Sequence, residues 1–296
     1  MSIQLMMVKK QMKKFGATFA SDHFDVEVLR EGAKASAQMP PVKGVTYEEK
    51  VYDGITVDVA APKKETSGNL IIYIHGGGMV SGDPRYVRSF TSYLANAYGG
   101  KVYGVVYGLS PEYKFPEPVE HSVTAIKAIR RENPGAKITL VGESAGAYHV
   151  VACTLMLKAQ GEVLPDAVVA FAPLIDVSGV LDRSAYPDDM VVDYRALPAM
   201  ISCFCREDQD LTDPICSPYY ADFTGFPPLR VVWDSSECLS VDCRELVKKA
   251  KTAGVTVESK EWSGTFHTFE MLAAILPEGK KEIAETLAFI RKYTEA

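Results

Sequence analysis

Hydrophobic and polar positions alternate regularly over most of the chain. From residue 70 onward, short apolar runs such as Leu70–Ile74 and Ala167–Phe171 are separated by longer amphipathic stretches. Uninterrupted apolar runs of this length are typical of strands buried on both faces, as in a parallel sheet covered by helices. The pattern therefore predicts an α/β fold with right-handed crossovers. Further strands are expected at Val102–Val106, Ile138–Val141, Leu229–Trp233 and Val255–Glu261, and helices at Arg85–Ala97, Pro118–Glu132, Ala145–Gln160, Ser240–Ala253 and Lys280–Glu295.

The region before residue 70 has a different pattern. Its lysine-rich opening predicts an amphipathic helix, which either docks on the protein, the interpretation we favour, or lies on a membrane surface. Residues 32–41 are irregular, and residues 45–61 predict a β-hairpin that turns at Asp53-Gly54. Residues 176–213 also break the alternation and predict an insertion over one edge of the sheet. The apolar stripe of the opening helix consists of Leu5, Val8, Met12 and Phe15.

Composition narrows the classes of protein that this chain can belong to. Of its 296 residues 47% are hydrophobic, yet no run approaches the roughly 18 to 20 apolar residues of a spanning helix. Disorder and integral membrane association are therefore excluded. A net charge of −6 argues against nucleic-acid binding. Six cysteines without a C-x-x-C pair predict free thiols, and with no recognisable secretory signal we expect a cytoplasmic protein.

A glycine-flanked serine follows one of the predicted strands. The motif Gly142-Glu143-Ser144-Ala145-Gly146 lies between the strand Ile138–Val141 and a helix that begins at Ala145. In a nucleophile elbow, a tight strand-to-helix turn requires small flanking residues and holds a serine hydroxyl above the sheet. The motif therefore predicts Ser144 as a nucleophile at the N-terminus of a helix.

Three consecutive glycines follow the strand Leu70–Ile74, in the sequence His75-Gly76-Gly77-Gly78. Glycines have no side chains to shield their amides, so the N–H groups can face a ligand oxygen. In an α/β hydrolase this loop forms the oxyanion hole together with the amide of the residue after the nucleophile. We expect the donors to be Gly77, Gly78 and Ala145, with Gly76 as a further candidate.

A serine nucleophile needs a base, and the chain has five histidines. His267 lies on a loop after the last predicted strand, which suits the order nucleophile, acid, histidine along the chain. We therefore predict His267 as the general base, the alternative being a histidine that caps the next helix. Of the others, His75 belongs to the glycine loop and His149 lies in the helix after the nucleophile. We expect His121 and His23 to be in contact with solvent.

These motifs resemble those of the hormone-sensitive-lipase-like (bacterial type IV) carboxylesterases, which have the α/β-hydrolase fold. The likeness runs from about Leu70 to the C-terminus. It rests on HGGG, on GESAG where the family usually has GDSAG, on the segments 107–116 and 213–229, and on the G-x-x-H-x-F pattern of Gly264, His267 and Phe269. The resemblance implies a single domain, residues 1–296, with a mostly parallel sheet flanked by helices. It also implies a helical cap made of about 1–44 and 176–213.

The acid of the triad departs from the family pattern. Ser236 aligns with the usual aspartate, whereas Glu237 resembles a variant in which glutamate serves instead. A carboxylate at this place fixes the histidine tautomer and stabilises the imidazolium. We favour Glu237. Asp234 is the alternative acid, although it would equally suit a turn or helix cap, and Asp242 or an impaired triad stay open.

Together, the motifs predict a serine carboxylesterase that works through an acyl-enzyme and requires no metal or organic cofactor. By resemblance, its partner is a small short-acyl ester. An acetyl deacetylase acting on sugars or xenobiotics, or a lactone hydrolase, would use the same machinery. A non-catalytic small-molecule receptor on a hydrolase scaffold is the alternative from another class. Family members often pair, and the sequence leaves a homodimer open.

Overall fold

The computed structural model describes residues 1–15, 18–20, 24–35, 37 and 39–295. One eight-stranded sheet runs through the molecule, in the order β1-β2-β4-β3-β5-β6-β7-β8. The pairs from β4 onward are parallel, whereas β1 and β2 join as an antiparallel hairpin. The predicted α/β fold is therefore confirmed. The strands are β1 (Val45–Tyr52), β2 (Ile55–Pro62), β3 (Leu70–Ile74), β4 (Val102–Val105), β5 (Ile138–Glu143), β6 (Ala167–Phe171), β7 (Leu229–Asp234) and β8 (Val257–Trp262).

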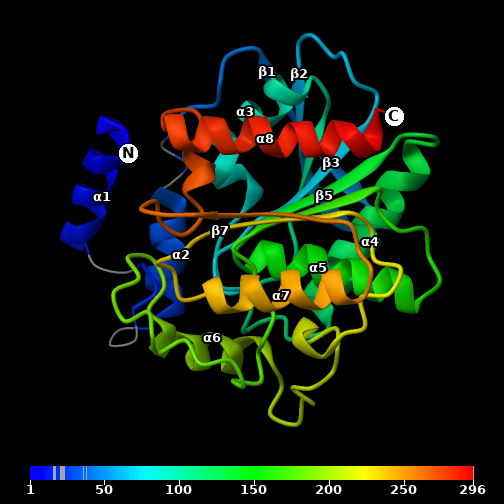
Figure 1. Ribbon diagram of the computed structural model, residues 1–296. Helices are drawn as coiled ribbons and strands as arrows, with labels where there is room; N and C mark the ends of the chain where they lie inside the picture. The colour runs from blue at the N-terminus through cyan, green and yellow to red at the C-terminus, as the bar shows by residue number, and fades with distance from the viewer. Residues whose placement is uncertain (16–17, 21–23, 36, 38, 296) are drawn as a thin grey trace.

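Helices cover both faces of this sheet, as Figure 1 shows. α3 (Arg88–Tyr98) and α8 (Pro277–Thr294) pack on one face; α4 (Glu117–Glu132), α5 (Ala145–Ala159) and α7 (Ser240–Thr252) pack on the other. Every residue of β3, β5 and β6 is buried, which explains why these strands read as uninterrupted apolar runs. Each face carries its own hydrophobic cluster, so the core consists of two layers separated by the sheet.

The hairpin turn was predictable because of its backbone requirements. Asp53 and Gly54 both have a positive φ, 49° and 87°, as a type I′ turn between twisted strands demands. Aspartate and glycine are among the residues that adopt this conformation most readily. The resulting register pairs Tyr52 with Ile55 and Val45 with Pro62.

The opening helix α1 (Ile3–Phe15) docks its apolar stripe on the protein. Leu5 is only 1% exposed and packs with Phe266, Phe269 and Leu276. Lys9 Nζ donates to the carbonyl of Gly264 at 2.8 Å. The docking interpretation is thus confirmed for the described residues, while the side chain of Phe15 lies outside them. The irregular stretch expected from residue 32 was wrong in part, because α2 (Val26–Ala35) extends into it.

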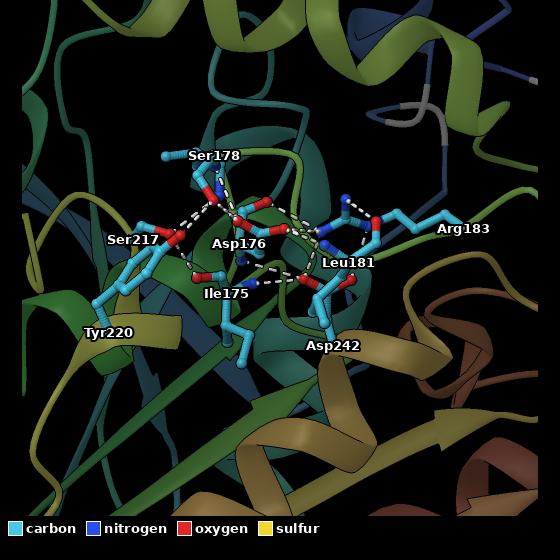
Figure 2. A network of polar contacts seen from close by, with 9 residues as sticks. Ile175, Asp176, Ser178, Leu181, Arg183, Ser217, Tyr220 and Asp242 are labelled. Carbon is cyan, nitrogen blue, oxygen red and sulfur yellow. Dashed lines mark hydrogen bonds and ion pairs between the residues drawn. The ribbon is translucent and has the colours of Figure 1, made fainter. Parts of the chain in front are cut away.

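A buried ionic network fastens the 176–213 insertion to α7 (Figure 2). The Nε and Nη2 atoms of Arg183 donate to the two carboxylate oxygens of Asp242, at 2.8 and 2.7 Å. Asp242 also accepts the amides of Ile175 and Asp176, so it satisfies the backbone where the chain leaves β6. The insertion then continues into the short helix α6 (Leu197–Phe204). Asp242 is therefore engaged in holding the insertion.

The order of the strands places the candidate residues together. The glycine loop follows β3, Ser144 follows β5, Glu237 follows β7 and His267 follows β8. Because these strands are parallel, their carboxyl ends meet at one edge of the sheet, where α/β proteins bind ligands. The fold thus assembles four segments that are far apart in sequence.

Two expectations from composition can be compared with the structure. All six cysteines are free, as predicted. Within the described ranges, no helix combines the length and apolar character needed to cross a bilayer.

Candidate active site

Ser144 occupies a strained turn between β5 and α5. Its φ of 55° and ψ of −120° lie outside the regions that non-glycine residues normally adopt. Its amide donates to the carbonyl of Phe171 at 2.8 Å, which fixes the turn to the neighbouring strand β6. The side chain is half-buried and lines a cavity. These features are those of the predicted nucleophile elbow.

The two flanking glycines are required by close packing. A Cβ on Gly142 would lie 2.2 Å from the carbonyl oxygen of Gly146. A Cβ on Gly146 would lie 2.0 Å from the carbonyl oxygen of Ile74, the last residue of β3. Both contacts are far shorter than atoms tolerate. The elbow therefore presses against the start of the glycine loop, and only glycine fits at either position.

Glu143 connects the elbow to the glycine loop. Its Oε1 accepts the amide of Gly76 at 2.5 Å and the hydroxyl of Tyr73 at 2.9 Å. Burial raises the pKa of Glu143 to about 7, although these two hydrogen bonds lower it. The Gly76 amide is therefore committed to Glu143 and faces away from any substrate oxygen. In the described part of the chain, the amides of Gly77 and Gly78 have no acceptor.

The histidine loop brings His267 against a carboxylate. The Nδ1–H of His267 donates to Oε2 of Glu237 in a very short contact, and both side chains are buried. Burial lowers the pKa of His267, but Glu237 outweighs that effect and the net shift is upward. The Nε2 atom is buried and has no hydrogen-bond partner among the described residues. An acid-oriented imidazole with a free Nε2 is poised to accept a proton.

Asp234 lies close to this pair but has a different task. Its Oδ2 accepts both the amide and the hydroxyl of Thr265, at 2.8 and 2.6 Å. Its Oδ1 accepts the amide and the hydroxyl of Ser236, at 3.0 and 2.5 Å. The carboxylate thus ties the end of β7 to the histidine loop and shapes the turn that carries Glu237. Four donors occupy its oxygens, and none of them is His267.

A small apolar cavity adjoins Ser144. Its volume is about 30 Å³, which is more than one water molecule needs. Gly78 and Ala145 form the floor beside the serine, and the N-terminal segment and the insertion supply the opposite walls. The other lining residues are Phe19, Met79, Leu174, Val192, Leu197, Met200, Ile201 and Leu239.

Comparison with known proteins identifies the family. Residues 71–271 match the family described as the alpha/beta hydrolase fold. The chain belongs to this α/β-hydrolase family. It is 33% identical to an acetyl-hydrolase of Streptomyces hygroscopicus over 81% of this chain and 80% of that protein. An esterase of Acinetobacter venetianus is 31% identical over 74% of each chain. A crystal structure of an esterase from the bacterial hormone-sensitive lipase (HSL) family has a TM-score of 0.91, with 30% identity over 99% of both chains.

These similarities confirm the resemblance that the motifs suggested. As an α/β hydrolase whose relatives are named esterases and acetyl-hydrolases, the protein is a carboxylic ester hydrolase. No group of three or more His, Cys, Asp or Glu side chains suited to a metal ion occurs in the part of the chain that the structure describes.

The other histidines of this α/β hydrolase have structural surroundings. The ring of His75 stacks on Tyr107 and the ring of His149 contacts it at a tilt, with ring centroids 4.4 and 4.3 Å away. Burial lowers the pKa values of His75 and His149 to about 4 and 3. His121 was expected in solvent, but its Nδ1 accepts the amide of Gly108. His23 lies outside the described residues.

Sequence reasoning missed several residues of the site. Phe19, Met200 and Leu239 reach the cavity from three separate segments, and no local motif marks them. Asp189 lies in the insertion and no motif marks it, yet it contacts the turn that carries Glu237. Only long-range contacts in the folded chain identify these positions.

The pKa of Glu143 predicts a pH dependence of stability. Between pH 4.5 and 7 the unfolded chain ionises Glu143 while the folded protein keeps it protonated, so the fold loses stability as pH rises. The substitution Glu143→Gln preserves an oxygen acceptor but cannot ionise. Relative to this variant, the wild type should lose up to about 3 kcal/mol of unfolding free energy between pH 4.5 and 8. Urea unfolding of both proteins at both pH values measures this difference. Equal losses of unfolding free energy in the wild type and in Glu143→Gln would contradict the prediction.

Proposed function

We propose that this ester hydrolase uses Ser144 as nucleophile, His267 as general base and Glu237 as the triad acid. The observation that carries the proposal is the buried Glu237–His267 contact, which leaves Nε2 free. Ser144 and His267 follow β5 and β8, whose carboxyl ends lie at the same edge of the sheet, which supports their pairing. Catalytic hydrogen bonds are often long or misaligned before substrate binds, so the nucleophile and base are expected to meet in the substrate complex.

The reaction follows from these groups. Ser144 Oγ attacks the ester carbonyl while His267 Nε2 takes its proton. The negative oxygen that forms is stabilised by the amides of Gly77, Gly78 and Ala145, each worth about 3 kcal/mol. The imidazolium then protonates the departing alcohol, which leaves an acyl group on the serine. Water, activated by the same imidazole, releases the acid and restores the serine.

We further propose that the acyl group is acetyl or another short chain. The cavity beside Ser144 is apolar and small, with a volume of about 30 Å³, which favours a short acyl chain. The relative from Streptomyces hygroscopicus is named an acetyl-hydrolase, which supports the same preference. Deacetylation of a sugar or xenobiotic and lactone opening use the same chemistry and differ only in the alcohol. A non-catalytic receptor is disfavoured because such a protein has no need of a buried carboxylate–imidazole pair.

Residues 1–44 and 176–213 are proposed to act as a cap over this acyl site. Phe19 and Val192, one from each segment, form a parallel β-bridge at the cavity. Met200 on α6 lies opposite Gly78, where a Cβ would come within 2.6 Å of its sulfur. The cap thus sets the length of the cavity. We place the enzyme in the cytoplasm, which its six free thiols support.

A series of p-nitrophenyl esters tests the function. Acetyl, butyryl and octanoyl esters should give a kcat/KM that falls at least about tenfold from butyryl to octanoyl, because longer chains overfill the cavity. Replacing Ser144 with alanine should lower kcat at least about 10⁴-fold. Ser184→Ala, at an exposed serine of the 176–213 insertion, is the matched control and should keep wild-type activity. An active Ser144→Ala variant would refute the mechanism, and a preference for octanoyl would refute the short-acyl assignment.

A further inference from the structure

The cap contributes a carboxylate to the turn that bears the triad acid. Asp189 Oδ2 accepts the backbone amide of Cys238, the residue after Glu237, at 2.8 Å. Its other oxygen accepts the amides of Val191 and Val192 at 2.9 and 3.1 Å. One side chain therefore joins two segments that are about 49 residues apart in sequence.

These contacts connect the acyl cavity with the catalytic acid. Val192, whose amide Asp189 holds, lines the cavity and bridges to Phe19. Cys238, held by the other oxygen, follows Glu237 and precedes Leu239, which also lines the cavity. A shift of Asp189 would move both the cavity wall and the turn that carries Glu237, which we call the acid turn. We infer that Asp189 is a positioning residue that couples the cap to Glu237 and adds its negative charge behind the Glu237–His267 pair.

The electrostatic surroundings agree with this role. Burial lowers the pKa of His267, whereas Glu237, Asp189 and Glu143 each raise it. Asp189 thus favours the imidazolium that forms when Ser144 is deprotonated. Asp188 is the neighbouring aspartate and provides a matched comparison, because it is exposed and lines the same pocket while the Cys238 amide donates to Asp189. The charged groups that face the pair come from the cap, β5, the 3₁₀ turn after His267 and α1: Asp188, Asp189, Glu143, Glu270, Lys9 and Lys13.

The test compares pH profiles of kcat/KM for Asp189→Asn and Asp188→Asn with a soluble acetyl ester. Removing the charge of Asp189 should lower the pKa of His267, so the acidic limb should move about half a pH unit or more toward lower pH. At the pH optimum, kcat/KM should fall about tenfold because the turn loses an acceptor. Asp188→Asn should leave the acidic limb of the pH profile unchanged. A uniform loss of rate without a shifted limb would reduce Asp189 to a structural role and overturn the inference.

A second variant distinguishes loss of the charge from misfolding. Asp189→Glu keeps the charge, so it should retain the wild-type acidic limb even if its kcat is lower. An Asp189→Glu limb that shifts like that of Asp189→Asn would contradict the role of charge. The inference rests on the proposed triad, which the Ser144→Ala control tests separately. Failure of the inference on Asp189 and failure of the proposed triad can therefore be distinguished.

The solvent face of α1 is a different feature, which neither the active site nor the core uses. Ile3, Met6 and Met7 are 68%, 50% and 69% exposed, although they are large apolar side chains. Lys10 continues the same face at helical spacing and is exposed. Lys13 is exposed as well, at the border between this face and the pocket beside the Glu237–His267 pair. Leu5, Val8 and Met12 occupy the opposite, docked face. The helix stands at the edge of the molecule (Figure 1).

We propose that this face binds the surface of an anionic phospholipid bilayer. The helix carries four lysines and no acidic residue, in a protein whose net charge is −6. Apolar side chains beside a cationic cluster match the acyl boundary and headgroups of such a surface. A second copy of the chain is a poorer partner, because two such helices face to face would bring lysines together. Since α1 packs on Phe266, binding would hold the histidine loop near the bilayer.

Cosedimentation with vesicles tests this surface. The protein should bind phosphatidylcholine vesicles that contain phosphatidylglycerol, and at least about threefold less should bind in 0.5 M than in 0.05 M salt. Lys10→Gln/Lys13→Gln and Met6→Gln/Met7→Gln should each abolish binding while keeping the wild-type melting temperature. The control Lys63→Gln/Lys64→Gln, on an exposed loop after β2, removes the same charge and should still bind. The proposal would be overturned if the protein did not bind the vesicles or if the α1 variants bound as well as the wild type. It would also be overturned if the protein were a dimer that Met6→Gln/Met7→Gln dissociates.

Discussion

The buried contact between Glu237 and His267 is the constraint on which the arrangement of the site depends. A carboxylate removed from water is costly unless it is paired and hydrogen-bonded. Glu237 meets this requirement by accepting the His267 Nδ1–H and, at 3.0 Å, the amide of Asp234. The imidazole is held in one orientation as a result. The turns around the pair hold these atoms within contact distance.

Asp234 and Asp189 support that contact from opposite sides. Asp234 links the end of β7 to Thr265 and so fixes the histidine loop relative to the acid turn. Asp189 reaches the same turn from the cap and holds the amide of Cys238. The proposed triad acid is thus fastened both to the sheet and to the proposed cap. We therefore expect changes in the cap to alter catalysis without contact to a substrate.

Local motifs made the nucleophile and the glycine loop predictable, whereas the acid required the fold. The need for glycine at Gly142 and Gly146 arises within a single turn, and the sequence displays it directly. Asp234 and Glu237 are three residues apart, and either could reach His267 in an extended or a turned conformation. Only the hydrogen bonds of Thr265 and Ser236 show that Asp234 is already occupied. The helices α2 and α6 carried too weak a periodic signal, because few of their residues are buried and one of these, Met200, packs against the distant Gly78.

The most direct test of the account compares Glu237→Gln with Asp234→Asn in kcat/KM for a p-nitrophenyl acetate substrate, corrected for the folded fraction. If Glu237 orients His267, its amide variant should stay folded and lose about 10⁴-fold in rate. Asp234→Asn should lower the melting temperature and lose much less activity, because it disturbs the turn and leaves the acid in place. A near-wild-type Glu237→Gln enzyme beside an inactive, well-folded Asp234→Asn enzyme would contradict the account.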